Sequence, residues 1–149
     1  MKYLVGGITI IISCLIAGIF GILLLFPNSI VTNQYATLEA ARTDHLFGRG
    51  WLPNILPPSA YDIHTSNNLD INISDGKFSF SPSEYMLFAS RTRQYIVVNT
   101  PFVNWEKTVA RRRKKGFQPT IYAEESTRWV FFCKVSEGYC EYVMHHVDE

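Results

Sequence analysis

The amino-acid sequence predicts an α+β domain behind one N-terminal transmembrane helix. The run from Leu4 to Phe26 is apolar, contains no charged residue and is long enough to cross a hydrocarbon core of ~30 Å as a helix. The residues after it alternate between period-two apolar patterning, typical of strands, and helical spacing. We therefore expect residues 1–26 to be the anchor. Residues 27–149 should form one periplasmic domain with an antiparallel sheet and two to three helices.

The length of the apolar run favours an uncleaved anchor. A secretory signal has an apolar core of only ~7–15 residues and a small-residue cleavage site, which residues 27–30 do not supply. A lipoprotein signal cleaved before Cys14 is the alternative, although the residues after Cys14 stay apolar up to Phe26. Lys2 precedes the span and the first charge after it is Glu39, so the positive-inside rule places the N-terminus in the cytoplasm and the domain in the periplasm.

One face of the predicted anchor carries only small side chains. Thr9, Ser13, Ala17 and Gly21 recur every four residues. Small residues let a second helix approach closely in lipid, where side-chain packing drives association. The expected partners are therefore the lipid bilayer and an integral-membrane protein, although many single-span helices are rich in small residues without any partner.

The domain has local signals for both kinds of element. Ser81-Pro82-Ser83-Glu84 is a helix start, with a serine cap and a proline at the first position. Gly48 and Gly116 are helix stops. The last third of the chain predicts a strand meander. We expect helices over residues 32–47, 82–91 and 104–115, and strands over residues 77–81, 95–98, 120–123, 129–135 and 139–144.

Cys133 and Cys140 flank a predicted turn at residues 135–138. If Ser136 and Glu137 form a two-residue turn, the cysteines face each other across a hairpin at disulfide distance. If Gly138 instead makes a bulge after a three-residue turn, they point to opposite faces. In an oxidising compartment the bridge is the expected state. Their spacing is not a zinc pattern.

The stretch from Gly50 to Ile63 contains three prolines and several large apolar residues. Prolines make it extended and remove backbone donors. It is either an ordered linker over the core, which a short chain favours because it needs its large apolar residues for packing, or an exposed recognition segment. In the second case its partner-binding residues are Trp51, Leu52, Pro53, Ile55 and Leu56.

This stretch reads W-L-P-x-x-L-P-x-S-A-x-x-I, and Phe78 and Phe80 follow it. Together with the hairpin residues 129–133 and 139–142, it resembles a group of small, uncharacterised bacterial envelope proteins that carry an N-terminal anchor or a lipoprotein signal. The resemblance covers about half of the domain. It implies an envelope location and a non-enzymatic protein, and it assigns no catalytic residue.

A run of five basic residues ends the predicted helix over residues 104–115. Cations at a helix C-terminus favour the helix dipole, so a solvated last turn is one interpretation. A contact with anionic lipid or with an acidic partner protein is the other. Nucleic acid is not expected, because the chain carries 14 basic and 13 acidic residues and is not basic overall. The run consists of Arg111, Arg112, Arg113, Lys114 and Lys115.

The ionisable residues form no recognisable catalytic motif. His145 and His146 with Asp148 and Glu149 have side chains that can bind a metal. A terminal tail is more often solvated, so we expect no metal site and no cofactor. No G-x-S-x-G or comparable motif accompanies the histidines. We therefore expect no catalytic residue.

These features together predict a non-enzymatic, membrane-tethered binding protein. The first hypothesis is an accessory or assembly subunit of a larger inner-membrane complex. The second is an envelope immunity protein that neutralises an incoming toxin, which needs only the tether and an inhibitory surface. The third is a hydrolase or metal-dependent enzyme that uses the histidines and aspartates.

Overall fold

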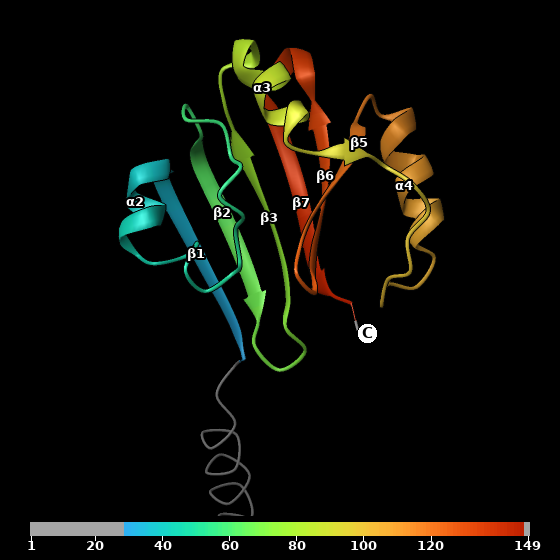
Figure 1. Cartoon of the computed structure of the whole chain (residues 1–149), viewed down its shortest axis with the longest axis horizontal. Coiled ribbons are helices and arrows are strands. Elements are labelled where there is room, and N and C mark those ends of the chain that lie inside the picture. The colour runs from blue at the N-terminus through green and yellow to red at the C-terminus, as the bar shows by residue number, and fades with distance from the viewer. Residues whose placement is uncertain (1–28, 148–149) are drawn as a thin grey trace, which may run out of the picture.

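The computed structural model describes residues 29–147, which fold around a seven-stranded antiparallel sheet (Figure 1). The strand order is β1-β2-β3-β7-β6-β5-β4. The last strand in the chain, β7, therefore joins the two halves, because it pairs with β3 on one side and with β6 on the other. The strands are β1 (Ile30–Thr37), β2 (Tyr61–Asn68), β3 (Ile73–Ser79), β4 (Arg93–Gln94), β5 (Gln118–Glu124), β6 (Thr127–Lys134) and β7 (Tyr139–His146).

The helices are few and short, which corrects the α+β prediction. Helices α2 (Leu38–Thr43) and α3 (Tyr85–Ser90) have six residues each, and α4 (Trp105–Lys114) has 10. Two 3₁₀ turns, η1 (Pro82–Glu84) and η2 (Val135–Glu137), complete the set within residues 29–147. The described chain is thus mostly a seven-stranded sheet, and the predicted C-terminal meander is only one half of it.

None of the helices in residues 29–147 is long and apolar enough to cross a membrane. The predicted span over residues 1–26 lies outside the described residues. The same holds for its small-residue face of Thr9, Ser13, Ala17 and Gly21, and for Cys14.

The helix expected over residues 32–47 is wrong in its first half, where the chain forms β1. Val31 and Tyr35 face the core side of the sheet opposite Asn67 and Ile63 of β2. Tyr35, Leu38 and Ala41 have helical spacing by coincidence, because Tyr35 lies in β1 whereas Leu38 and Ala41 lie in α2. Thr37 marks the true start, where its Oγ1 accepts a hydrogen bond from the backbone N–H of Ala40 at 3.2 Å.

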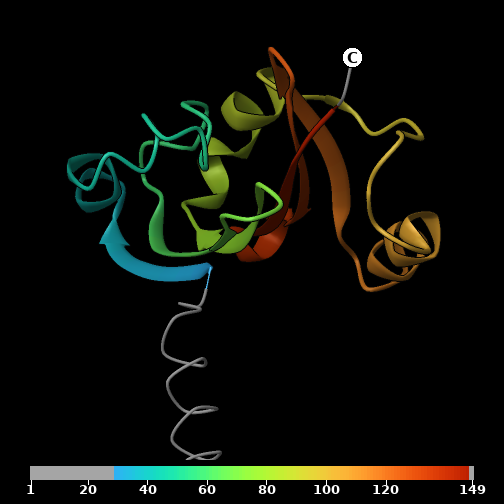
Figure 2. The same cartoon turned by 90° about the horizontal axis from the view of Figure 1, so that it is seen from below.

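The two faces of the sheet have separate cores. On the first face, α2, α3 and residues 44–60 cover β1, β2, β3, β7 and β6. On the second face, α4 and residues 95–104 cover β5, β6 and part of β7. In Figure 2 the orange and red strands lie between α3 and α4. Residues 129–133 of β6 are all buried because this strand is covered on both faces.

Aromatic rings fill the first core. Phe88 of α3 packs edge-on against Phe131 of β6, with ring centroids 5.1 Å apart. Phe78 of β3 lies 6.1 Å from Phe88 and 6.3 Å from Phe131. The period-two pattern that predicted β3 reflects this burial, since Phe78 and Phe80 point inward. Leu87, the neighbour of Phe88 in the chain, is exposed because it lies on the outer side of α3.

The β6–β7 hairpin joins Cys133 and Cys140 in a disulfide. Gly138 has a left-handed φ of 59°, as a bulge would require. The loop nevertheless contains an even number of residues, so Lys134 pairs with Tyr139 and Cys133 with Cys140. The cysteines therefore share a face, with their Cα atoms 4.1 Å apart. Gly138 therefore adopts the left-handed conformation without the bulge that would have turned the two cysteines to opposite faces of the hairpin.

The helices expected over residues 82–91 and 104–115 are confirmed, within a residue or two at their ends. The strand expected over residues 95–98 is wrong. Only Arg93 and Gln94 pair with β5, after which Tyr95 is buried while Ile96 and Val97 are exposed. The chain leaves the sheet there to pass over the second face toward α4.

Candidate binding groove

The second face of the sheet carries a groove of about 460 Å³. Its floor is formed by β3 and β7, and one wall by α4. A helix of 10 residues is only about 15 Å long and covers β5 to β7. Side chains on this face of β1 to β3 stay exposed or half-buried. The groove therefore lies where the covered half of the face meets the open half.

A row of polar side chains crosses the floor. Strand register pairs Gln34 with His64, His64 with Lys77, and Lys77 with Glu141. The polar row ends there, because Glu141 pairs with Phe132 of the second core. Directly paired residues project on the same face of a sheet. The register thus brings together residues that are more than a hundred positions apart in the chain.

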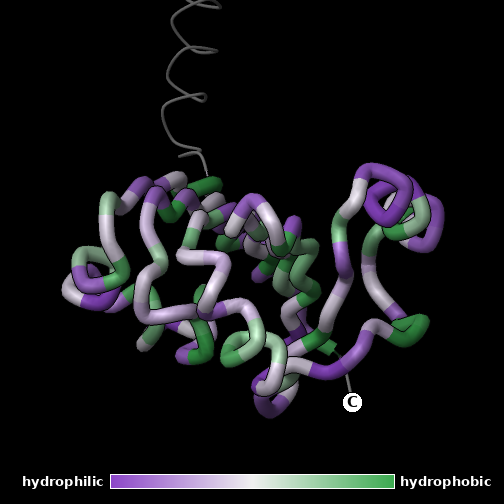
Figure 3. Tube along the Cα trace, turned by 90° about the horizontal axis from the view of Figure 1, so that it is seen from above, coloured by the Kyte–Doolittle hydropathy of each residue, from purple (hydrophilic) through white to green (hydrophobic). Residues whose placement is uncertain are grey.

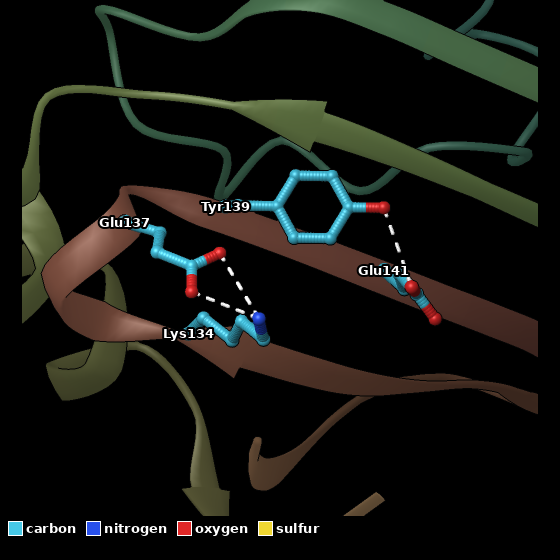
Figure 4. A network of polar contacts seen from close by, with 4 residues as sticks. All are labelled: Lys134, Glu137, Tyr139 and Glu141. Atoms are coloured by element: carbon cyan, nitrogen blue, oxygen red, sulfur yellow. Dashed lines mark hydrogen bonds and ion pairs between the residues drawn. The ribbon is translucent and has the colours of Figure 1, made fainter. Parts of the chain in front are cut away.

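Arg112 fixes the wall to the floor. Its Nη1 donates a hydrogen bond to Glu141 Oε2. The Tyr139 hydroxyl donates to Glu141 Oε1 at 3.3 Å (Figure 4). The Arg112 guanidinium also lies over the rings of Phe117 and Phe132, 5.3 and 5.8 Å from their centroids. Charge pairing and ring contact together hold α4 against β7.

The hairpin end beside the groove is held by a second ion pair. Lys134 Nζ donates to Glu137 Oε1 at 2.8 Å and to Oε2 at 3.1 Å (Figure 4). Burial raises the pKa of the nearby Tyr139 hydroxyl and so favours its protonated form, which donates to Glu141. The polar groups of this hairpin end are therefore paired with one another, and together they form the end of the groove.

A bulge in β2 builds the opposite edge. The register shifts between Tyr61 and His64, and Asp62 adopts a left-handed φ of 47°. His64 Nε2 donates to Asp62 Oδ1 at 2.9 Å, and Gln34 Nε2 donates to the same oxygen at 3.1 Å. The hydrogen bond from His64 is the main cause that lowers the pKa of the Asp62 carboxyl. Bulges often redirect side chains in this way beside binding sites.

Two charged side chains on the floor remain available. Lys77 is exposed and has no ion-pair partner among residues 29–147. Asp75 lies two positions earlier on the same strand face and is also exposed, although partial desolvation raises the pKa of its carboxyl. The groove therefore offers one cation and one carboxyl group between the aromatic side of α4 and the polar edge of β2.

The tryptophan–proline stretch does not contribute to this groove. Leu52, Pro53, Ile55 and Leu56 are buried in the first core. Trp51 is half-buried, and its backbone carbonyl accepts a hydrogen bond from the Trp129 ring at 3.4 Å. The stretch is an ordered linker over the core, and the exposed recognition segment that would have made these residues partner-binding does not fit their burial.

The five basic residues do not form one patch. Arg112 points into the groove, and Arg113 lies over the ring of Tyr95, 5.6 Å from its centroid. Arg111, Lys114 and Lys115 are exposed. Consecutive positions of a helix point about 100° apart, so a run in sequence is spread around α4. Arg113 is exposed as well, so a contact made by this run has at most four exposed cations.

The histidines predicted as metal candidates separate. His145 faces the second core and is buried against Phe102, with ring centroids 5.8 Å apart, whereas His146 faces the other way and is exposed. Burial lowers the pKa of His145. Asp148 and Glu149 lie outside the described residues. Residues 29–147 contain no group of three or more metal-ligating side chains.

Sequence reasoning missed the groove itself. The available signal was the alternation of polar residues at positions 64, 66, 75 and 77, whose intervening positions are apolar, small or neutral. That pattern marks a strand face in contact with water. It does not say which other strand lies beside it, and the wall on α4 has no local signal.

Residues 29–79 match the family described as the YbbD head domain. The match runs from the residue before β1 to the end of β3, so it includes the open half of the groove and excludes the α4 wall. It indicates a bacterial protein. Neither the curated proteins nor the solved structures include a significant match to the chain.

Proposed function

We propose that this chain is a non-enzymatic binding protein of the bacterial envelope, tethered to the inner membrane by residues 1–26 with its domain in the periplasm. In this proposal the groove receives a segment of a partner protein. The observation that carries it is the arrangement of charge in the groove: the wall and the edge are held by internal pairs, while Lys77 and Asp75 on the floor are exposed.

The groove suits an extended protein segment. Its volume lies within the range of ~300–1,000 Å³ of ligand pockets, and it is open toward β1, where Thr32 and Gln34 are exposed. Trp105 and Phe132 supply aromatic surface on the α4 side. Aromatic contact with a few charges around it is typical of protein interfaces. The partner should therefore present an apolar side chain toward α4 and an acidic one toward Lys77.

The pairing of the ionisable groups supports binding rather than catalysis. The His64 ring donates to the Asp62 carboxylate, and Glu141 is engaged by Arg112 and Tyr139. A nucleophilic mechanism needs a base in hydrogen-bond contact with a hydroxyl or thiol that it can activate. Glu141 accepts a hydrogen bond from the Tyr139 hydroxyl, but this carboxylate is paired with Arg112, and burial raises the pKa of that hydroxyl. The contacts of His64 and Glu141 instead fix the shape of the groove, as a preformed binding surface requires.

The accessory or assembly subunit of an inner-membrane complex is the form of this function that we favour. The small-residue face of residues 9–21 would contact a partner helix in lipid, and the groove would hold a soluble segment of the same complex. An immunity protein is the second candidate. It is favoured by the position of the groove on the sheet face, where a protein arriving from outside could reach it.

Gentle detergent extraction of the full chain from its own membranes tests the proposal. Lys77→Glu should lower recovery of the partner by about fivefold, the effect of ~1 kcal/mol on an equilibrium. Lys107→Glu is the matched control, since Lys107 is exposed on α4 outside the groove. Equal recovery with both variants would refute the groove as the binding site.

The same experiment separates the two candidates. A stoichiometric integral-membrane complex supports the accessory subunit. Purification of the chain alone, combined with protection of cells that depends on Lys77, supports the immunity protein. Protection that persists in the Lys77→Glu variant would contradict the proposed groove in either case.

A further inference from the structure

The turn between β2 and β3 exposes two aliphatic side chains at its tip. Leu69 is 52% exposed and Ile71 is 62% exposed. They stand in a short turn over residues 69–72, a place where polar residues normally prevail. We call Leu69 and Ile71 the apolar tip.

The geometry of the turn does not depend on these two side chains. The backbone N–H of Asp70 donates to the side-chain oxygen of Asn68 at 3.1 Å, and Asn72 takes the left-handed conformation with φ 48°. The asparagines therefore specify the turn. Leu69 and Ile71 belong to neither core. Neither local conformation nor burial explains why they are aliphatic.

The apolar tip lies where the described chain begins. The backbone N–H of Leu69 donates to the Ser29 carbonyl at 2.9 Å. Figure 1 shows the β2–β3 turn and the start of β1 side by side at one end of the sheet, and Figure 3 shows a hydrophobic segment at that start. Only three residue steps separate Phe26, the end of the apolar run, from Ser29. Three steps span at most about 10 Å.

We propose that the apolar tip enters the headgroup region of the membrane that holds residues 1–26. This inference rests on the proposed membrane tether. The apolar run ends three residue steps, at most about 10 Å of chain, before Ser29, and Ser29 contacts the turn. In this proposal a bilayer around that run therefore brings its interface to the tip. Interfacial apolar side chains are buried ~5–10 Å into the headgroup and acyl boundary.

The chemistry of the contact is apolar rather than electrostatic. Residues 66–76 contain no lysine or arginine, and Asp70 alternates with the two aliphatic residues. The exposed cations at the end of α4 lie at the opposite end of the sheet, because Gln118 at the start of β5 pairs with Cys133 near the end of β6. The contact should therefore be insensitive to salt and to anionic lipid. A second membrane contact would also limit rotation of the domain about its tether.

Lipid quenching of a fluorescent probe tests the apolar tip in the full chain. A Cys14→Ser, Ile71→Cys variant carries an NBD fluorophore at position 71 and is reconstituted into phosphatidylcholine vesicles that contain a nitroxide lipid. We expect the nitroxide to remove more than about half of the emission, as for groups buried ~5–10 Å at the interface. Replacing half of the phosphatidylcholine by phosphatidylglycerol should leave this value unchanged.

Met86 provides the matched control position. It is 76% exposed and apolar, and it lies on α3 beyond the opposite end of β3. A probe at position 86 should lose less than about a tenth of its emission, since interfacial burial does not extend across the length of a sheet. Equal quenching at both positions would overturn the inference.

Flotation of the vesicles separates failure of the tip from failure of the tether. Protein that does not float with the vesicles overturns the tether and the tip together. Protein that floats but shows no quenching at position 71 overturns the tip alone, and a blue-shifted, unquenched probe would show that protein covers it instead. Quenching that requires phosphatidylglycerol would overturn the apolar contact.

Discussion

Removal of the Cys133–Cys140 bridge should lower the free energy of unfolding by about 2.5 kcal/mol. The two cysteines are seven positions apart, so the bridge closes a loop of about eight residues. The chain-entropy relation for cross-links gives ~2.5 kcal/mol for a loop of that length at 25 °C. The folded hairpin keeps its register through backbone pairing. The loss therefore arises mainly in the unfolded state.

Urea unfolding of the full chain in mild detergent measures this effect through the fluorescence of the three tryptophans. With slopes of about 1–3 kcal/mol/M, reduction should lower the midpoint by roughly 0.8–2.5 M. A Cys133→Ala, Cys140→Ala variant should show the same loss with or without reductant. Cys14→Ser is the matched control and should keep the full response to reductant, because its cysteine is not part of the bridge.

An unchanged midpoint after reduction would refute the reasoning, provided that mass spectrometry of alkylated protein shows an open bridge. A loss found only in the double alanine variant would mean that packing of the two buried sulfur atoms, and not the cross-link, stabilises the hairpin. The two measurements together separate covalent from packing contributions.

Three further predictions concern single residues. Gly76→Ala should lower the free energy of unfolding by about 3 kcal/mol or more in urea titrations, because a Cβ there would lie 2.1 Å from the backbone carbonyl oxygen of His64 and 2.7 Å from Cε1 of Tyr142. Arg112→Ala should cost about 1–2 kcal/mol by the same assay, since it unpairs a half-buried carboxylate, whereas Arg111→Ala should stay within about 0.5 kcal/mol. Stability should fall as the pH drops from about 7 to 5, because the lowered pKa of His145 makes the unfolded state take up the proton first. Urea midpoints across that range should be flatter in His145→Gln, and an identical slope would contradict the assignment.

Local sequence signals predicted those helices and strands whose own residue pattern matches their burial in the fold. The helix at Trp105–Lys114 was visible because its buried residues Trp105 and Val109 are one turn apart. The end of β3 was visible from the alternation at residues 77–81, and β7 was visible as the last strand of the predicted meander; each has one face in the first core. In these segments local propensity and tertiary burial agree.

The remaining features of the fold and the groove depend on which strands pair with each other, and no local sequence pattern specifies that pairing. Strand β1 forms because its backbone pairs with the edge of β2. The spacing of the apolar residues in β1 would also suit a helix. β7 occupies the middle of the sheet although it comes last in the chain. The pairing of Lys77 with Glu141 follows from that position. A groove floored by two strands more than 60 residues apart could not be predicted before the strand order was known.

The two ends of the sheet differ in a way that fits the proposed function. Apolar side chains are exposed at Leu69 and Ile71 beside the start of β1, while exposed cations are found where α4 ends, at the far end of β5. The groove opens on the sheet face between these ends. If the apolar tip meets the membrane, the strands point away from the bilayer and the groove opens sideways into the periplasm. A partner that shares the membrane could then reach Lys77 from the side without displacing the tip, so Lys77→Glu should weaken partner binding and leave quenching at position 71 intact.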